Sequence, residues 1–181
     1  MPNPGNPSDG PLHPPLAALA ALRAGHRRYL AGTATGSPGP APTVAVFSCA
    51  DPQPAAETLF PGVDLYVVRT AGLAVGPSVL GSLEYAVDRL GVPLVVVLGH
   101  DRCGAAAGAG DGAVRRAAAL LLQRSTLLAR AVTAGHCAVV GMSWRAELGR
   151  VRPVPRVAPA PAARLRSRAR PPAARPAGAP R

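Results

Sequence analysis

Two cysteines and a histidine have the types and the placement that a zinc ion prefers. His100 and Cys103 stand three residues apart, just after an uncharged apolar run, and Cys49 follows a second such run. Thiolate sulfur and imidazole nitrogen are common zinc ligands, usually in a tetrahedral arrangement. The sequence therefore predicts one metal site made by Cys49, His100 and Cys103. Water or the carboxylate of Asp51 would complete the coordination.

The same three residues have a second interpretation, as a core histidine beside two inert cysteines. Free cysteine is among the most often buried residue types. However, Cys49 and Cys103 stand in turns that also carry aspartate or glycine rather than inside strands, which favours the metal site. His136 and Cys137 have no other ligand nearby in the sequence, so we expect a surface histidine and a buried, unreactive cysteine. His13 and His26 are assigned no role.

The elements that would position these ligands alternate between strands and helices. Short apolar runs bounded by turn residues predict strands over 43–48, 65–69, 94–98 and 137–142. Apolar residues at helical spacing predict helices over 16–30, 82–90 and 114–134. A β-α-β order implies right-handed crossovers and an α/β fold with a mostly parallel sheet flanked by helices. The ligands would then meet where the first and third strands end.

The 181-residue chain divides by composition into a body and two low-complexity ends. Residues 1–14 are rich in Pro, Gly and Asn, and we expect them to be disordered. Residues 15–149 are long enough for one domain with its own core. Residues 150–181 are rich in Arg, Pro and Ala without apolar periodicity. We therefore expect a disordered tail, and removal of residues 152–181 should leave the fold unchanged.

The charge of the chain is placed mainly in that tail. The formal net charge is +11, but nine arginines and no acidic residue lie from Arg150 onward, so residues 1–149 carry only +2. The tail has no aromatic residue on which bases could stack, so no nucleic-acid partner is expected. No apolar run could cross a bilayer, no signal peptide is recognisable, and three cysteines do not make a disulfide framework. We expect a cytoplasmic protein without a membrane partner.

Five segments share a pattern with a known family. They are 23–29 (RAGHRRY), 49–51 (CAD), 68–72 (VRTAG), 81–87 (GSLEYAV) and 99–104 (GHDRCG). Together they resemble the β-class carbonic anhydrases, and the resemblance extends over residues 16–149. The pairing of Cys-x-Asp with His-x-x-Cys is the most specific part of this pattern.

The resemblance implies a zinc lyase that interconverts carbon dioxide and bicarbonate and forms a homodimer or a higher homo-oligomer. Cys49, His100 and Cys103 would hold Zn²⁺. Asp51 would be the catalytic residue that accepts the hydrogen bond of zinc-bound hydroxide, or it would bind zinc itself in a closed resting form. Gly72 would bring backbone close to the substrate.

Three features depart from the family pattern. Gln53 stands where the motif Cys-x-Asp-x-Arg ends in arginine, Leu73 stands where an asparagine usually follows Ala-Gly, and the region between Cys103 and the last strand is short. An amide cannot replace the bidentate, cationic partner that keeps the aspartate off the metal. Two functions therefore stay open. One is a carbonic anhydrase weakened by Gln53 and the short middle region; the other is a non-catalytic, zinc-binding relative with a binding or regulatory role.

Overall fold

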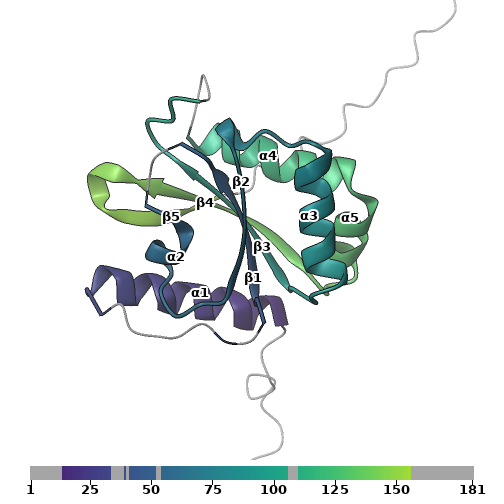
Figure 1. The fold of residues 1–181 in the computed structure, drawn as a ribbon, viewed down its shortest axis with the longest axis horizontal. Coiled ribbons are helices and arrows are strands. Elements are labelled where there is room, and N and C mark those ends of the chain that lie inside the picture. Colours follow the sequence, from purple (N-terminus) through teal and green to yellow (C-terminus); the bar gives the residue numbers. More distant parts are fainter. Residues whose placement is uncertain (1–13, 34–38, 40, 52–53, 106–109, 156–181) are drawn as a thin grey trace, which may run out of the picture.

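Within the described residues, five strands form one sheet that is flanked by helices (Figure 1). This computed structural model describes residues 14–33, 39, 41–51, 54–105 and 110–155. The predictions for residues 1–13, for Gln53 and for residues 156–181 therefore lie outside the described residues. The strands are β1 (Val44–Cys49), β2 (Leu65–Thr70), β3 (Leu94–His100), β4 (Ala138–Arg145) and β5 (Arg150–Val154). The α-helices are α1 (Pro14–Leu30), α2 (Ala56–Leu59), α3 (Pro77–Asp88), α4 (Asp111–Arg124) and α5 (Thr126–Thr133). Two short 3-10 helices are η1 (Ala71–Leu73) and η2 (Ala146–Leu148).

The sheet has the strand order β2-β1-β3-β4-β5. The first four strands run parallel, which confirms the predicted parallel sheet, and β5 pairs antiparallel with β4. Every residue of β1 and β3 is buried, as expected for central strands covered on both faces. The chain goes from β1 outward to β2 and then crosses to β3 on the other side of β1. The crevice at such a switch in direction is where open α/β sheets bind ligands.

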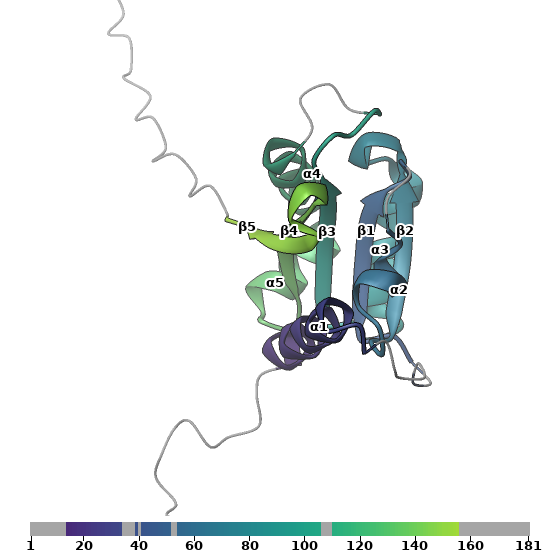
Figure 2. The same cartoon turned by 90° about the vertical axis from the view of Figure 1, so that its left-hand side faces the viewer.

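Two helical layers cover the sheet, α1 and α2 on one face and α3, α4 and α5 on the other (Figures 1 and 2). Side chains alternate along β1, so Phe47 and Cys49 face the layer of α3 to α5, whereas Val44 and Val46 face α1 and α2. Cys49 is thus directed into the larger of the two helical layers. Among the described residues, no helix is both long and apolar enough to span a membrane.

The region predicted as one helix over 114–134 is instead two helices that meet at Ser125. The hydroxyl of Ser125 accepts the backbone N–H of Leu128 at 3.0 Å, which caps the start of α5. The same hydroxyl donates to Glu84 on α3 at 2.6 Å. The continuous prediction was wrong because the apolar periodicity passes through this break, whereas a buried serine at a cap turns the chain.

The strand β5 corrects the predicted boundary between the body and the tail. Residues 150–154 were assigned to the tail, but they pair with β4 at the edge of the sheet. Val154 is buried and belongs to the core cluster beneath α3 to α5. This strand was missed in the sequence because it contains Pro153. Proline is unfavourable inside a sheet, but it is tolerated in an edge strand such as β5.

His26 on α1, which was assigned no role from the sequence, connects α1, the end of α2 and β5. Its Nδ1 donates to the carbonyl of Leu59 at 3.1 Å, since a carbonyl can only accept. Its Nε2 then accepts the backbone N–H of Val151 at 2.9 Å. The histidine therefore satisfies backbone groups of two segments far apart in the sequence and holds β5 against α1.

Two truncations test this corrected boundary. Removal of residues 156–181 is expected to leave the unfolding midpoint unchanged, because that segment has no apolar periodicity. Removal of residues 150–181 should lower the free energy of unfolding by about 2 kcal/mol or more, because it exposes the site of Val154 and deletes the β4–β5 pairing. Denaturant unfolding of the three proteins provides the measurement. Equal stability of the two truncated chains would contradict the assignment of β5 to the body.

Candidate metal centre

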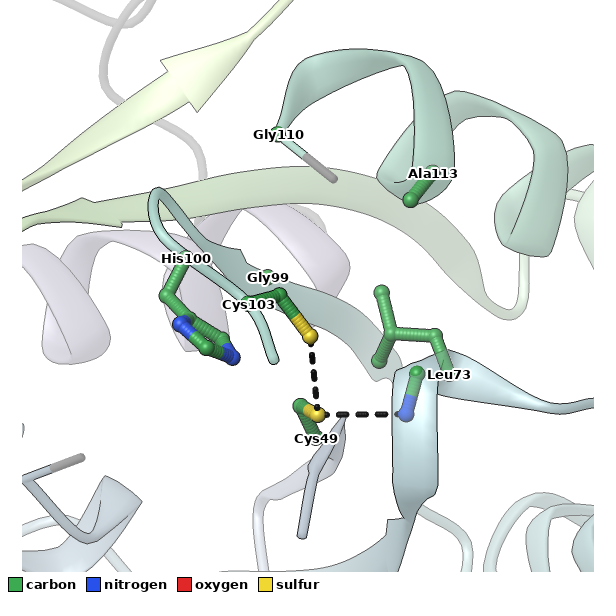
Figure 3. A pocket seen from close by; sticks show the side chains of 8 residues that line it. Cys49, Leu73, Gly99, His100, Cys103, Gly110 and Ala113 are labelled. Carbon is green, nitrogen blue, oxygen red and sulfur yellow. Dashed lines mark hydrogen bonds between the residues drawn. The ribbon is translucent and has the colours of Figure 1, made fainter. Parts of the chain in front are cut away.

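The ends of two neighbouring strands bring the three predicted ligands together. Cys49 is the last residue of β1, His100 is the last residue of β3, and Cys103 lies in the turn that follows β3. The two cysteine Sγ atoms and a ring nitrogen of His100 all lie within 4.8 Å of one another. These side chains therefore form one cluster where β1 and β3 end, facing a small cavity (Figure 3).

The sulfur atoms have the separation that a tetrahedral metal ion requires. Sγ of Cys49 and Sγ of Cys103 are 3.6 Å apart. Zinc–sulfur bonds of about 2.3 Å at the tetrahedral angle place two sulfurs about 3.8 Å apart. The pair therefore fits zinc with almost no movement of the backbone.

The ring of His100 is held in the tautomer that a metal ligand needs. Its Nδ1 donates to the carbonyl of Asp101 at 2.9 Å, so Nε2 carries the free lone pair. Nε2 is buried and makes no hydrogen bond within the described residues. Buried polar atoms almost always have a partner. A metal ion bound to Nε2 would supply that partner, so the donor set fits a zinc ion.

The environment of Cys49 favours its thiolate, which is the form that binds metal. Burial raises the pKa of this thiol, but hydrogen bonds, among them those from the backbone N–H groups of Asp51 and Gly72, lower it to about 7. The N–H of Gly72 donates to Sγ of Cys49 at 3.2 Å (Figure 3). Near neutral pH, a large fraction of Cys49 is therefore ready to bind a cation.

Cys137 has the opposite character, as the sequence predicted. Burial raises the pKa of its thiol to about 11, so it stays protonated near neutral pH. Its neighbour His136 is exposed. Neither residue belongs to a ligand cluster among the residues that the structure describes.

Asp51 lies beside the cluster, with its carboxylate held by the backbone. Oδ2 of Asp51 accepts the N–H of Gly104 at 2.9 Å and lies 3.7 Å from Nε2 of His100. Within the described part of the chain, this carboxylate has no guanidinium partner. The carboxylate is thus close enough to the donor atoms either to orient a metal-bound molecule or to bind the metal itself.

Arg69 supports this arrangement, and sequence reasoning gave it no role beyond its place in a family segment. Its Nε donates to the carbonyl of Cys49 at 3.1 Å, and its Nη2 donates to the carbonyl of Asp51 at 3.4 Å. Parallel pairing sets Arg69 on β2 beside Ser48 on β1. This register is the signal by which the role of Arg69 could have been found. Arg69 lies opposite the residue before Cys49, so its side chain can reach the turn that follows Cys49.

Apolar groups form the rest of the cavity wall, which Gly72, Leu73, Gly99, Gly110 and Ala113 line together with the ligands. The cavity has a volume of about 10 Å³, which is room for one water-sized molecule. A Cβ atom at Gly99 would overlap the side chain of Val114 on α4, so glycine allows this helix to approach β3. The cluster can therefore hold a metal ion with one small, mostly apolar space beside it.

Known proteins with related sequences are carbonic anhydrases. A family model described as carbonic anhydrase matches residues 44–118. The chain is 34% identical over 188 residues to carbonic anhydrase 2 of Mycobacterium tuberculosis, in an alignment that covers 75% of this chain and 91% of the relative. It is 48% identical over 104 residues to a carbonic anhydrase of Mycolicibacterium smegmatis, covering half of each chain.

Solved structures show the same fold. The β-carbonic anhydrase CafA of Aspergillus fumigatus matches with a TM-score of 0.56 at 20% identity, over 80% of this chain and 88% of that one. A carbonic anhydrase from Streptococcus mutans matches with a TM-score of 0.51 at 24% identity, over 76% of this chain and 97% of that one. The sequence identity to the mycobacterial relative, its nearly complete coverage and the shared fold together show that this chain belongs to the β-carbonic anhydrase family.

Proposed function

We propose that the protein catalyses the reversible hydration of carbon dioxide, in which CO2 and H2O give bicarbonate and a proton. Cys49, His100 and Cys103 would hold the zinc ion. The observation that supports this most directly is the buried Nε2 of His100, which makes no hydrogen bond within the described residues, beside two cysteine sulfurs at a zinc-compatible separation. When bound, zinc supplies a Lewis acid that makes hydroxide available from water near neutral pH.

The residues around the cluster would orient the reactants. Asp51, held by the N–H of Gly104, would accept a hydrogen bond from the attacking water and so direct its lone pair at the carbon of CO2. Gly72 would serve in two ways, since its N–H stabilises the Cys49 thiolate and its backbone lines the space that the substrate enters. Arg69 would keep Cys49 and Asp51 in place through their carbonyl groups.

A second candidate function is that of a non-catalytic, zinc-binding protein with a binding or regulatory role. The observation that favours it is the position of Asp51, whose carboxylate lies 3.7 Å from Nε2 of His100 without a guanidinium partner in the described residues. Gln53 in place of the usual arginine points the same way. A carboxylate free to bind the metal would block the position that water needs.

We propose, as further expectations of the family resemblance, that the protein works in the cytoplasm as a homodimer or a higher homo-oligomer. The odd number of cysteines, which does not make a disulfide framework, supports the first of these. Size-exclusion chromatography with light scattering would measure the oligomeric state.

The ligand assignment predicts zinc contents for four variants. The unmodified protein should carry about one zinc per chain, and Cys49→Ser, His100→Ala and Cys103→Ser should each lose most of it, because three protein ligands are needed to retain the ion. Cys137→Ser is the matched control and should retain its metal, since this residue lies outside the cluster. Atomic absorption after dialysis against a chelator gives the answer. Full occupancy in all three ligand variants would rule out this site.

Arg69 should affect metal affinity without touching the metal. We expect Arg69→Ala to weaken zinc binding by about tenfold, because groups that hold ligands in place typically contribute this much. Arg89→Ala is the control, since Arg89 is exposed and its ion pair in the described part of the chain is with the neighbouring Asp88. Competition with a zinc-binding dye measures both affinities. Equal affinities of the two variants would show that Arg69 does not position the site.

Variants of Gln53 and Asp51 test whether the missing arginine limits the rate of CO2 hydration. Gln53→Arg should raise the rate of CO2 hydration, because a bidentate partner would keep the Asp51 carboxylate off the metal. Asp51→Ala also frees the metal, but it should stay about 100-fold slower than Gln53→Arg because nothing then orients the attacking water. Stopped-flow hydration assays across neutral and alkaline pH compare the three proteins. If the unmodified protein already matches Gln53→Arg, the partner argument is wrong; if no variant is active with zinc bound, the non-catalytic function is the better account.

A further inference from the structure

Leu73 is held in a backbone conformation that leucine rarely adopts. Its φ is +60°, in the left-handed region, and it directly follows Gly72 at φ +63°. Glycine tolerates this region freely, but a leucine Cβ crowds the backbone there. Such residues persist only when the surrounding structure stabilises them, and they cluster at functional sites. The strain at Leu73 therefore needs a compensating interaction.

The compensating interaction is the burial of the Leu73 side chain against the metal-ligand cluster. This side chain is 6% exposed and lines the same cavity as Cys49, His100 and Cys103. In the view of Figure 3, the two sulfur atoms lie between the His100 ring and the Leu73 side chain. Among the described residues, Leu73 is thus the bulky apolar group in a wall otherwise made of glycine, alanine and the ligands themselves.

The side chain of Leu73 packs against β3 at Gly99. A Cβ atom added at Gly99 would lie 3.6 Å from Cδ1 of Leu73, in ordinary van der Waals contact. The leucine therefore packs directly over the strand end that carries His100. What remains open beside the ligands is about 10 Å³. The side chain of Leu73 accounts for much of that narrowness, because the glycine and alanine residues of the wall contribute little bulk.

We propose that Leu73 is a specificity-determining residue that sets the size limit of the metal-site cavity. It admits molecules up to about the size of CO2 and bicarbonate and excludes bulkier ones, such as aromatic anions. This inference deepens the proposed hydration of CO2, because it names the residue that restricts that site to the smallest substrates. A purely structural role would instead make Leu73 equivalent to any other buried leucine of the same core.

Thiol reagents of two sizes test the limit on the full-length protein as purified. Iodoacetamide is small, whereas N-phenylmaleimide is bulky, and peptide mass spectrometry follows modification of Cys49 and Cys103 by each. The measured quantity is the rate with the bulky reagent divided by the rate with the small one. Leu73→Ala should raise this ratio by about tenfold or more, since even single methylene groups produce discrimination of that order in apolar pockets. Cys137 is buried and does not line the cavity, so its modification rate is the internal standard for general opening of the core.

Three further variants separate size selection from general loosening of the core. Leu73→Met keeps the side-chain volume, so it should keep the low ratio. Leu83→Ala should also keep the low ratio, because Leu83 is fully buried in the same cluster but does not line the cavity. Leu73→Gly removes the side chain and also suits the left-handed backbone, so it replaces Leu73→Ala if that variant fails to fold. The proposal is overturned if the ratio stays unchanged when the side chain is removed, or if Leu83→Ala raises it equally.

The same variants show whether the size limit acts on the reaction. Azide should inhibit CO2 hydration similarly in the unmodified protein and in Leu73→Ala, whereas benzoate should inhibit only Leu73→Ala. Equal benzoate inhibition of both proteins would contradict the proposal. If no variant hydrates CO2, the proposed function fails, but the thiol ratio still decides whether Leu73 limits access to the cluster.

Discussion

The parallel pairing of β1 with β3 is the constraint on which the candidate site depends. Residues 45–48 of β1 lie opposite residues 95–98 of β3, so both strands reach the same edge of the sheet within one or two residues of each other. Cys49 and His100 are the last residues of these strands. A slip of one residue in this register would shift one ligand by one residue along its strand and turn its side chain to the opposite face of the sheet. The apolar core on both faces prevents such a slip, because every residue of both strands is buried.

Backbone groups provide much of the stabilisation around the cluster. N–H groups of Asp51 and Gly72 donate to the Cys49 sulfur, the N–H of Gly104 donates to the Asp51 carboxylate, and the carbonyl of Asp101 fixes the His100 ring. Such dipoles are fixed by the fold and need no reorganisation when charge develops at the site. With Gln53 in place of arginine, one side-chain contact to Asp51 is lost. The main chain still supports the rest of the arrangement.

Much of the fold and the ligand cluster could be predicted from the sequence. Strong apolar runs mark β1 and β3, and cysteine and histidine at their ends mark the cluster, because both signals are local. Other features depend on contacts that only the folded chain makes. The edge strand β5 contains Pro153 and arginines and has no clear pattern, yet pairing with β4 makes it a strand. The break at Ser125 depends on its bond to Glu84, and the role of His26 depends on Val151, which lies 125 residues away in the chain. The strain at Leu73 is likewise a property of the backbone that no spacing of residues reveals.

X-ray absorption spectroscopy at the zinc edge would test directly whether Cys49, His100 and Cys103 form a zinc site where β1 and β3 end. We expect two sulfur neighbours at about 2.3 Å and two nitrogen or oxygen neighbours at about 2.0–2.2 Å, one of which shows the multiple scattering of an imidazole ring. A spectrum of the purified, zinc-containing protein without sulfur neighbours, or with four of them, would contradict this assignment.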